Sequence, residues 1–530
     1  MWHRHLARCR WFWGRRTVRG GKPNQHCSRH ARRGCHWSIF LCNARCRTVC
    51  YVPCMNAKRT QDLYDVIVLG AGSGGLNIAS FINRVGLRVL LVDRSAEAIG
   101  GDCLNYGCVP SKALIHVARE VAAARRATRF GLSVSSAVDM AAVRAYVREK
   151  QDVFRANENP DYLRSTGVTV ALGAAAFVGP DTVRVGDTHY RGKHIVIATG
   201  SRPRPYTLPG AENMVIHSNE TIFDIETIPD TLVLIGGGPI SLEIGQAFHM
   251  LGSNVHVIQT GPEILGKEDP VVAMRLREKM SADGMIFHLN TKPVRVEKGN
   301  ALVVSNNGAE EIIPFDALFA AVGRIPNIDA LNLEAAHVMV KDGKIVSDAF
   351  LRTTNHRVYV CGDAVGGYQF THAAELHASV LLRNFFAPFR QRVGYAGISW
   401  VTYTDPELAT FGASEQELTK AGVNHSVIET SFTEDDRAIL DEYEQGLVRL
   451  FISSKGLLLG GTMLAPNAGE LVQELTLAMA QGIPLTALSE KVYPYPTAGR
   501  MNRRTALLLR AQKLSPFAKK VLRTIFSFRS

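Results

Sequence analysis

The chain has 530 residues, of which 46% are hydrophobic and 21% are charged, as is typical of a soluble globular protein. This length exceeds what one hydrophobic core supports and corresponds to roughly three to four domains. No apolar run reaches the roughly 20 residues that a bilayer-spanning helix needs, which argues against an integral membrane protein.

The net charge of +13 lies at the N-terminus. Residues 1–61 contain twelve Arg, two Lys and no acid, so the remaining chain carries a net charge of −1. Because that remainder is nearly neutral, the charge does not indicate a nucleic-acid partner. The same segment holds seven of the ten Cys and four of the five Trp, which separates it from the rest of the sequence.

Three interpretations of residues 1–61 compete. A zinc module needs paired Cys or His spacings, but Cys42, Cys46, Cys50 and Cys54 form a single run without a partner pair. A transit peptide would be Arg-rich and acid-poor, but also Ser-rich and amphipathic, which this segment is not. The third interpretation, which we adopt, is that the segment is disordered or precedes the native start at Met55.

A dinucleotide-binding pattern follows this segment. Residues 64–69 form an apolar strand, after which come a glycine-rich turn, a helical pattern, and a second strand over 88–92. The glycines let the backbone approach a pyrophosphate at the helix N-terminus, and an acid about 20 residues on bonds a ribose hydroxyl. The candidate ligands are Gly70, Gly72, Gly75 and Asp93.

A second copy of this unit begins at Thr231, with strands over 232–235 and 255–258. Gln259 stands where an acid is expected. A neutral Gln can bond a ribose hydroxyl without repelling a 2′-phosphate, so NADH and NADPH both stay open. The candidate ligands in this unit are Gly236, Gly238 and Gln259.

The strongest signal is the segment over residues 100–112, which reads GGDCLNYGCVPSK. Cys103 and Cys108, at a glycine-bounded helix start, can close a disulfide across about one helical turn. The helix N-terminus and Lys112 would stabilise a thiolate there. Two buried structural thiols are the alternative, but the pair follows a dinucleotide unit, and the body of the protein holds one other Cys, Cys361.

These motifs resemble the FAD-dependent pyridine nucleotide–disulfide oxidoreductases, which include dihydrolipoamide dehydrogenase, glutathione reductase and mercuric reductase. The resemblance covers Asp62 to about Leu508. Besides the cysteine segment it is carried by residues 198–203 (ATGSRP), 321–327 (AVGRIPN), 360–363 (VCGD) and 402–407 (TYTDPE).

The resemblance implies an α/β fold with two interleaved Rossmann-like dinucleotide-binding domains and a C-terminal α+β dimerisation domain. The implied ranges are 62–205 with 327–393 for FAD, 206–326 for NAD(P), and 394–510 for the dimer interface. A homodimer is therefore expected. Beyond about Gly394 the pattern changes to antiparallel-looking strands and two helices, which agrees with a separate domain.

The resemblance also implies roles for single residues. Cys108 would face the flavin, Cys103 would exchange with substrate, and Lys112 by the flavin would pair with Glu243. Asp363 would bond the ribityl chain, and Thr371 and His372 would lie near the ring. The matching motifs contribute the further cofactor-binding candidates Thr199, Gly200, Gly323 and Gly362.

The expected reaction passes hydride from NAD(P)H to FAD, then electrons to the Cys103–Cys108 disulfide and on to an acceptor. A disulfide, a metal ion or another sulfur-group substrate could accept them, and no resident metal site is predicted. One alternative is a flavin-dependent quinone or metal-ion reductase whose cysteines act as a redox sensor. Another is a non-catalytic nucleotide-binding regulator. A cytoplasmic location is expected.

The resemblance fails near the C-terminus. Family members that reduce small disulfides end in His-Pro-Thr-x-x-Glu, supplied across the dimer interface, in which the His shuttles a proton and the Glu orients it. The aligned segment here is Tyr495-Pro496-Thr497-Ala498-Gly499-Arg500. Mercuric reductases also carry Tyr there but add a C-terminal Cys pair, whereas no Cys follows Cys361 in this chain. Tyr495 is therefore a candidate catalytic residue of open role.

Residues 511–530 form a basic tail in which Phe517, Val521, Ile525 and Phe526 recur at helical spacing among Lys and Arg. A basic amphipathic helix can rest on an anionic membrane surface. The alternatives are a helix packed on its own protein and a frayed tail.

Overall fold

The computed structural model describes residues 37–39, 51–53, 63–134, 137–512 and 514–529. The chain divides into two units, residues 1–61 and 62–530. In the first unit the described residues form the antiparallel strands β1 (Trp37–Ile39) and β2 (Tyr51–Pro53). The other residues of this segment, on which its interpretation as a disordered or non-native leader depends, lie outside the described residues. Across the described ranges, no helix is long and apolar enough to cross a membrane.

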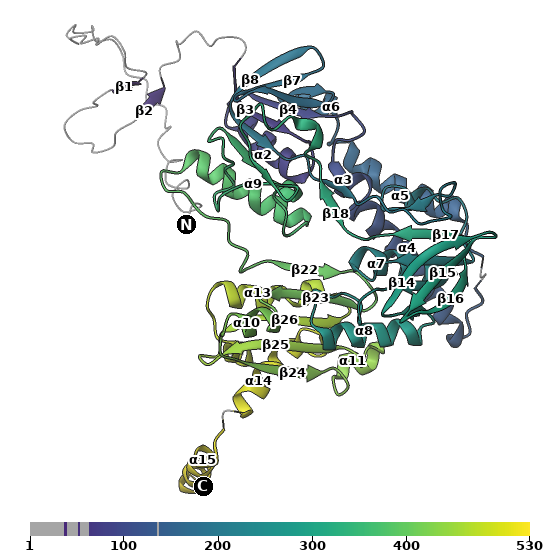
Figure 1. Ribbon diagram of the computed structural model, residues 1–530. Coiled ribbons are helices and arrows are strands. Elements are labelled where there is room, and N and C mark those ends of the chain that lie inside the picture. Colours follow the sequence, from purple (N-terminus) through teal and green to yellow (C-terminus); the bar gives the residue numbers. More distant parts are fainter. Residues whose placement is uncertain (1–36, 40–50, 54–62, 135–136, 513, 530) are drawn as a thin grey trace, which may run out of the picture. The chain divides into compact units, whose positions relative to one another are not determined.

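The first glycine-rich unit builds a seven-stranded sheet (Figure 1). Its strand β3 (Leu63–Leu69) pairs in parallel with β4 (Val89–Asp93) and with β8 (Thr188–Ile197). On its other side β8 pairs in parallel with β21 (Val358–Val360), so two distant parts of the sequence share one sheet, as the interleaved fold requires. The other strands are β5 (Thr169–Leu172), β6 (Ala175–Gly179) and β7 (Thr182–Val185).

Strand side chains alternate between two apolar clusters because successive residues point to opposite faces of a sheet. Val66 and Val68 join one cluster with residues of α2 (Ser73–Arg84) and α9 (Thr371–Phe386). Ile67 and Leu69 join the cluster on the other face. Both faces of β3 are therefore covered, which explains its continuous apolar sequence.

The second glycine-rich unit builds a five-stranded parallel sheet. Its strands, in spatial order, are β10 (Ile216–His217), β17 (Ala317–Ala320), β11 (Thr231–Ile235), β12 (Asn254–Ile258) and β13 (Ile286–His288). Its helices are α7 (Pro239–Leu251) and α8 (Pro270–Ala282). A three-stranded antiparallel sheet comprises β14 (Thr291–Glu297), β15 (Ala301–Asn306) and β16 (Ala309–Pro314).

The C-terminal part contains a five-stranded antiparallel sheet, in agreement with the predicted α+β domain. Its strands, in spatial order, are β22 (Ser399–Thr402), β23 (Glu407–Gly412), β26 (Leu458–Ala465), β25 (Leu447–Ser453) and β24 (His425–Ser431).

The expectation of two helices in this part was too low. The helices are α10 (Glu415–Lys420), α11 (Asp436–Asp441), α12 (Ala468–Leu471), α13 (Gln473–Ala480), α14 (Arg500–Gln512) and α15 (Pro516–Arg529). The first three have four to six residues. Fewer than two turns cannot establish a hydrophobic period, so the sequence did not reveal them. The predicted domain boundaries stay predictions, although the strands of each large sheet fall within one predicted domain.

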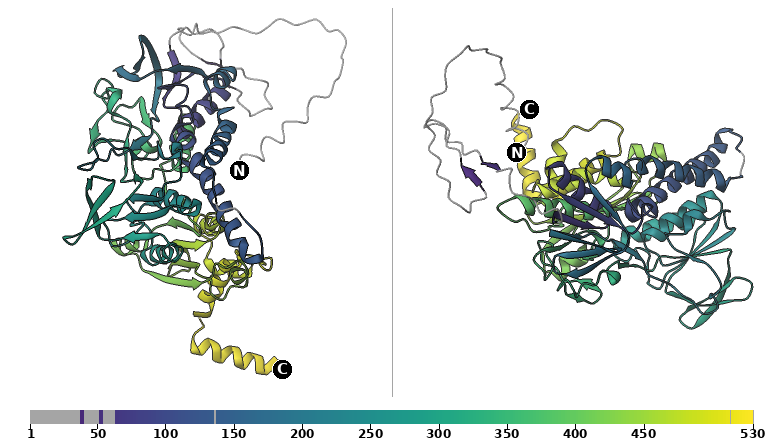
Figure 2. Two further views of the ribbon diagram at one scale, coloured as in Figure 1. Left: turned by 90° about the vertical axis from the view of Figure 1, so that its right-hand side faces the viewer. Right: turned by 90° about the horizontal axis from the view of Figure 1, so that it is seen from above.

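The two cysteines lie on two helices and not on one. Cys103 is in α3 (Gly101–Asn105), and Cys108 is the first residue of α4 (Cys108–Arg126). Gly107 separates the helices and allows a close approach, because a Cβ there would lie 2.9 Å from the carbonyl oxygen of Asp102. Helix α4 packs against α7 and against α5 (Met140–Arg155), and Figure 2 shows α4 and α5 side by side.

Two of the sequence motifs meet across a short antiparallel ladder. Strand β9 (Ser201–Pro203) pairs with β18 (Arg324–Pro326), and Ser201 stands opposite Pro326. This ladder joins the loop after β8 to the loop after β17. It therefore brings the ATGSRP and AVGRIPN motifs to one place.

Candidate active site

The first glycine-rich turn has the geometry that a bound dinucleotide requires. Gly70 has a φ of +106°, and a Cβ there would lie 2.3 Å from the carbonyl oxygen of Ala198. At Gly75 a Cβ would lie 1.9 Å from the carbonyl oxygen of Gly70. Larger residues would separate α2 from β3, so the backbone N–H groups at the start of α2 stay open to a pyrophosphate.

Asp93 and Gln259 make the same contact in the two units. The N–H of Ala71 donates to Oδ2 of Asp93 at 2.6 Å, and the N–H of Gly237 donates to Oε1 of Gln259 at 2.9 Å. Each side chain thus ties the end of a second strand to the glycine-rich turn beside it. Burial raises the pKa of the Asp93 carboxyl.

A cleft of about 2340 Å³ runs along these turns. Sixteen of the nineteen predicted site residues line it: Gly70, Gly72, Asp93, Cys103, Cys108, Lys112, Thr199, Gly200, Gly238, Glu243, Gln259, Gly323, Gly362, Asp363, Thr371 and His372. Gly75 and Gly236 do not line it, although both belong to the glycine-rich turns. Tyr495 does not line it either.

The residues present fit a flavin dinucleotide. The hydroxyl of Thr199 is buried at the cleft with no hydrogen-bond partner in the protein, so it can bond a ligand. Asp363 lies at the end of β21, where its Oδ2 accepts from the Ser201 hydroxyl at 2.6 Å. Burial raises the pKa of the Asp363 carboxyl. An acceptor at this depth suits a polyol chain such as the ribityl group.

The two thiols lie together at the cleft, and both are free. Cys108 opens the 19-residue helix α4 and is exposed to the cleft, and its sulfur lies 3.4 Å from the Thr371 hydroxyl. A hydrogen bond from Cys103, followed by Thr371 and the charge of Lys112, lowers the pKa of the Cys108 thiol to about 6, although partial desolvation of the thiol opposes this. The same hydrogen bond, together with burial, raises the pKa of Cys103. Of the two thiols, Cys108 therefore has the lower pKa.

Lys112 forms an ion pair with Glu243, as the resemblance implied. The Lys112 Nζ lies 2.6 Å from Glu243 Oε2 and 4.4 Å from the centre of the Tyr403 ring. Burial opposes the charge on Lys112, but the Glu243 carboxylate outweighs it and raises the pKa of Lys112. The lysine is thus held as a cation near the Cys108 thiol.

The TYTDPE motif positions Glu243, a role that sequence reasoning missed. The N–H of Tyr403 donates to Glu243 Oε1 at 3.0 Å. Two residues on, Asp405 and Gln246 exchange two hydrogen bonds, of 2.7 and 2.9 Å. Arg119 of α4 donates to the Thr404 carbonyl at 2.8 Å. The loop before β23 therefore holds α4 and α7 together behind the Lys112–Glu243 pair.

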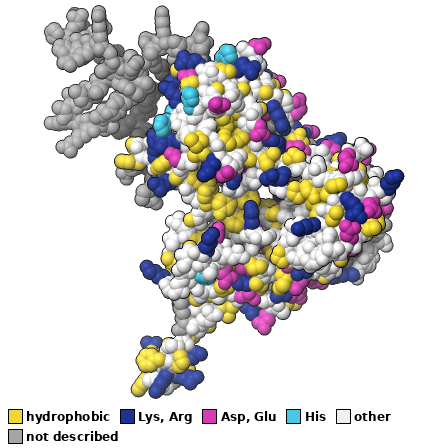
Figure 3. Space-filling model, in the orientation of Figure 1, with side chains coloured by type: hydrophobic (Ala, Val, Ile, Leu, Met, Phe, Trp, Pro, Cys, Tyr) yellow, Lys and Arg dark blue, Asp and Glu magenta, His cyan; other side chains and the backbone are white. Residues whose placement is uncertain are grey.

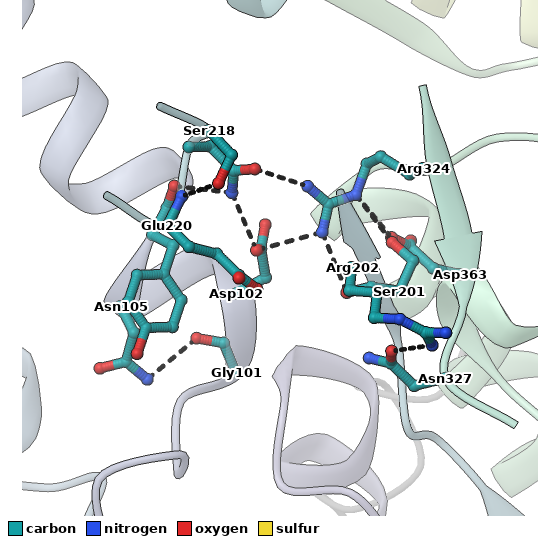
Figure 4. Close-up of polar contacts among 12 residues, drawn as sticks. Gly101, Asp102, Asn105, Ser201, Arg202, Ser218, Glu220, Arg324, Asn327 and Asp363 are labelled. Carbon is teal, nitrogen blue, oxygen red and sulfur yellow. Dashed lines mark hydrogen bonds and ion pairs between the residues drawn. The ribbon is translucent and has the colours of Figure 1, made fainter. Parts of the chain in front are cut away.

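Arg324 connects the cysteine segment to Asp363, and sequence reasoning missed it too (Figure 4). Its guanidinium lies 3.1 Å from Asp102, in α3 beside Cys103, and 4.0 Å from Asp363. It also donates to the hydroxyl and carbonyl of Ser201, at 2.7 and 3.0 Å. The motif containing Arg324 was recognised from the sequence, but Asp102 and Ser201 lie more than 100 residues away from it.

The C-terminal segment places Tyr495 and Arg500 in contact. The Tyr495 side chain is 67% exposed. The Arg500 guanidinium lies over its ring, 4.7 Å from the ring centre.

Cys361 is fully buried against the carbonyl of Ala374, which agrees with a core thiol. Among the described residues, no group of three or more His, Cys, Asp or Glu side chains could hold a metal ion.

Two family models match the chain. Residues 64–378 match the model of the pyridine nucleotide-disulphide oxidoreductases, and residues 398–505 match the dimerisation domain of the same family. The second match supports a homodimer, and it covers the antiparallel sheet of the C-terminal part.

Curated relatives and solved structures agree with these matches. A dihydrolipoyl dehydrogenase of Thermus scotoductus is 35% identical over 442 residues, which cover 82% of this chain and 95% of that protein. A mercuric reductase of Bacillus cereus is 32% identical over 445 residues, or 82% of this chain and 69% of that protein. The HOCl-induced flavoprotein disulfide reductase RclA of Escherichia coli has the same fold, with a TM-score of 0.76 and 23% identity over 84% of this chain and 100% of that one.

The first model covers more than half of the chain, and the Thermus relative is 35% identical over 82% of it. This chain therefore belongs to the pyridine nucleotide-disulphide oxidoreductases, the flavoprotein oxidoreductases that use FAD and NAD(P)H.

Proposed function

We propose that Cys103 and Cys108 are the redox centre and that the electron acceptor is a thiophilic metal ion. The observation that supports the redox role is the pair itself, because the two thiols hydrogen-bond at the cleft and one has a lowered pKa. FAD, when bound, supplies a carrier that takes hydride from NAD(P)H and delivers two electrons to the cysteines. The remaining work falls to residues of this chain.

The thiols divide the work. Cys108, at the start of α4, is held as a thiolate by the hydrogen bond from Cys103, by Thr371 and by the positive charge of Lys112. Cys103, whose pKa is raised, is the thiol that meets the acceptor. When the pair is oxidised, an S–S bond forms, and two electrons pass to the acceptor while the proton of Cys103 passes to solvent.

A metal ion suits this site better than a small disulfide does. Exchange with a disulfide needs a proton for the leaving thiolate, and a positioned His contributes about 10²–10⁴-fold to such a step. Tyr495 replaces that His, and Arg500 lies against its ring. Tyr, with an ordinary pKa of about 10, is a poor base at neutral pH. A soft metal ion binds to thiolates directly and needs no proton.

The metal-ion reaction balances without another reactant. One Hg²⁺ takes both electrons of the dithiol, or two Cu²⁺ take one each, and the disulfide is the other product. Several of the related sequences are named mercuric reductases, which supports this choice.

We also propose that the enzyme works in the cytoplasm, where thiols stay reduced.

Steady-state assays with NADH and NADPH test the acceptor. Hg²⁺, Cu²⁺, lipoamide, glutathione disulfide and a soluble benzoquinone should each be offered to the FAD-loaded enzyme. We expect the metal ions to be reduced fastest. A kcat/KM for either disulfide within the usual enzyme range of about 10⁴–10⁸ M⁻¹s⁻¹ would overturn the proposed acceptor.

The same assay separates the sensor alternative. If Cys108→Ser still reduces metal ions or the quinone at the wild-type rate, the cysteines are not the redox centre of that reaction. Loss of metal-ion reduction in both Cys103→Ser and Cys108→Ser, with FAD content unchanged, supports the proposal.

A further inference from the structure

Helix α15 separates its side chains by chemistry. At 100° per residue, its large apolar residues fall within one half of the helix circumference. These are Phe517, Val521, Leu522, Ile525, Phe526 and Phe528. The other half carries Lys519, Lys520 and Arg523, together with Thr524 and Ser527.

The charge of this region has one sign. From Lys491 to Ser530 the chain contains ten Lys or Arg and no acid. Arg529 lies within the apolar half, at the end of the helix, where its long side chain can bury its methylene groups and keep its charge in water. The helix thus combines an aromatic-rich face with a purely cationic one.

The apolar half of α15 is exposed. None of its residues is buried, and Phe517 and Phe528 are 76% and 87% exposed. Figure 3 shows hydrophobic and basic side chains together on this helix. The preceding helix α14 is also amphipathic, but its Met501 and Leu509 are buried in the core of the C-terminal part. The contrast shows that α15 is not a further layer of that core.

We propose that α15 docks the enzyme onto an anionic membrane surface. Fourteen residues form a helix of about 21 Å, too short to cross a hydrocarbon core of about 30 Å, so the helix would lie in the plane of the interface. There the Phe, Val, Leu and Ile side chains enter the boundary of headgroups and acyl chains, and the Lys and Arg side chains meet anionic headgroups.

Other occupants explain less. A nucleic acid would satisfy the cations but leave six large apolar side chains in water. A second copy of this chain would cover the apolar half but bring no acids from the matching segment, which has none. An anionic membrane satisfies both halves of the helix at once. This inference does not depend on which acceptor the enzyme reduces.

Vesicle flotation with the full FAD-loaded chain tests it. The vesicles are phosphatidylcholine with or without phosphatidylglycerol. We expect the enzyme to float with the anionic vesicles, to stay behind with the neutral ones, and to bind less as NaCl rises. Val521→Asn with Ile525→Asn should lower the partition coefficient about tenfold or more, because two aliphatic side chains no longer leave water.

Two further variants complete the design. Lys519→Gln with Arg523→Gln should weaken binding to anionic vesicles only. Thr524→Asn with Ser527→Asn, on the polar half, is the matched control and should bind like the wild type. All variants should keep wild-type turnover in the absence of vesicles, which shows that they fold.

Three results would overturn the proposal. One is an enzyme that stays behind with anionic vesicles. Another is equal flotation by the wild type and the Val521/Ile525 variant, since residues 1–61 are also basic and could bind by charge alone. The third is a change of oligomeric state in gel filtration, without a change in vesicle binding, when the α15 residues are substituted. That result would assign the apolar half to a second copy.

Discussion

The Lys112 ammonium lies 2.6 Å from Oε2 of Glu243, while the other carboxylate oxygen of Glu243 accepts the N–H of Tyr403 at 3.0 Å. Lys112 belongs to helix α4, Glu243 to helix α7 of the second glycine-rich unit, and Tyr403 to the loop before β23. One buried carboxylate therefore joins three parts of the molecule beside Cys108, the thiol with the lower pKa.

Replacing Lys112 by Met should raise the pKa of Cys108 by about one unit, because a nearby cation stabilises the thiolate. The readout is the long-wavelength absorbance that a thiolate gives beside bound oxidised flavin, followed against pH in a Cys103→Ser background. The absorbance appears as pH rises through the Cys108 pKa, so its midpoint should move up. Lys150→Met, which removes an exposed lysine on α5, is the control. An unchanged midpoint in Lys112→Met would contradict the charge argument.

The single cysteine variants should differ without any reductant. At neutral pH, Cys103→Ser should show the long-wavelength absorbance, because Cys108 is the thiol with the lowered pKa. Cys108→Ser should not show it, because the pKa of Cys103 is raised. If the absorbance appears in Cys108→Ser instead, the roles assigned to the two cysteines are reversed.

Replacing Arg324 by Met should lower the free energy of unfolding by about 3 kcal/mol, because Asp102 and Asp363 lose their shared cation. FAD content after purification should also fall. Arg324→Lys should be intermediate, since an ammonium cannot reach Ser201 and Asp102 with the geometry of a guanidinium. As a control, Arg191→Met breaks an exposed ion pair and should cost less than about 1 kcal/mol. Equal stability of the Arg324 and Arg191 variants in urea would refute this.

Restoring a His and an acid near the C-terminus should restore disulfide exchange. Tyr495→His combined with Arg500→Glu should raise kcat/KM for lipoamide or glutathione disulfide more than the two single changes together, since the acid orients the imidazole. The gain expected from a positioned base is about 10²-fold or more. The single variants serve as controls. An additive double variant would mean that the two positions do not act as a unit.

A protein that starts at Met55 should retain the FAD content and turnover of the full chain. Residues 1–61 form a unit separate from residues 62–530, and the cleft lies in the second unit. Absorbance at the flavin maximum relative to protein, with steady-state turnover, checks this. Loss of flavin on truncation would show that the leader contributes to the fold.

Sequence patterns predicted those parts of the site whose residues lie close together in the sequence. A strand, a glycine-rich turn and an acid lie within about 30 residues, so their order is sufficient to identify a dinucleotide site. The cysteine segment is equally compact. The pairing of Lys112 with Glu243 came from the family resemblance, because 131 residues separate them.

Contacts between distant segments could not be predicted in the same way. Arg324 reaches Asp102, and Arg119 reaches the carbonyl of Thr404 across 285 residues. Such contacts depend on how the sheets pack and leave no periodic pattern in the sequence. The division of the cysteine segment into two helices was missed for a different reason. It rests on the backbone at Gly107, where a side chain would meet Asp102.

Because the chain carries a dimerisation domain, membrane binding through helix α15 would be strengthened by avidity. A dimer carries two such helices, and once one has bound to a bilayer the second binds intramolecularly. Bivalent attachment of this kind can strengthen binding by about 10²–10⁴-fold without any new contact. Residence at the membrane would then report on subunit association, and dilution below the dimer dissociation constant would release the enzyme into solution.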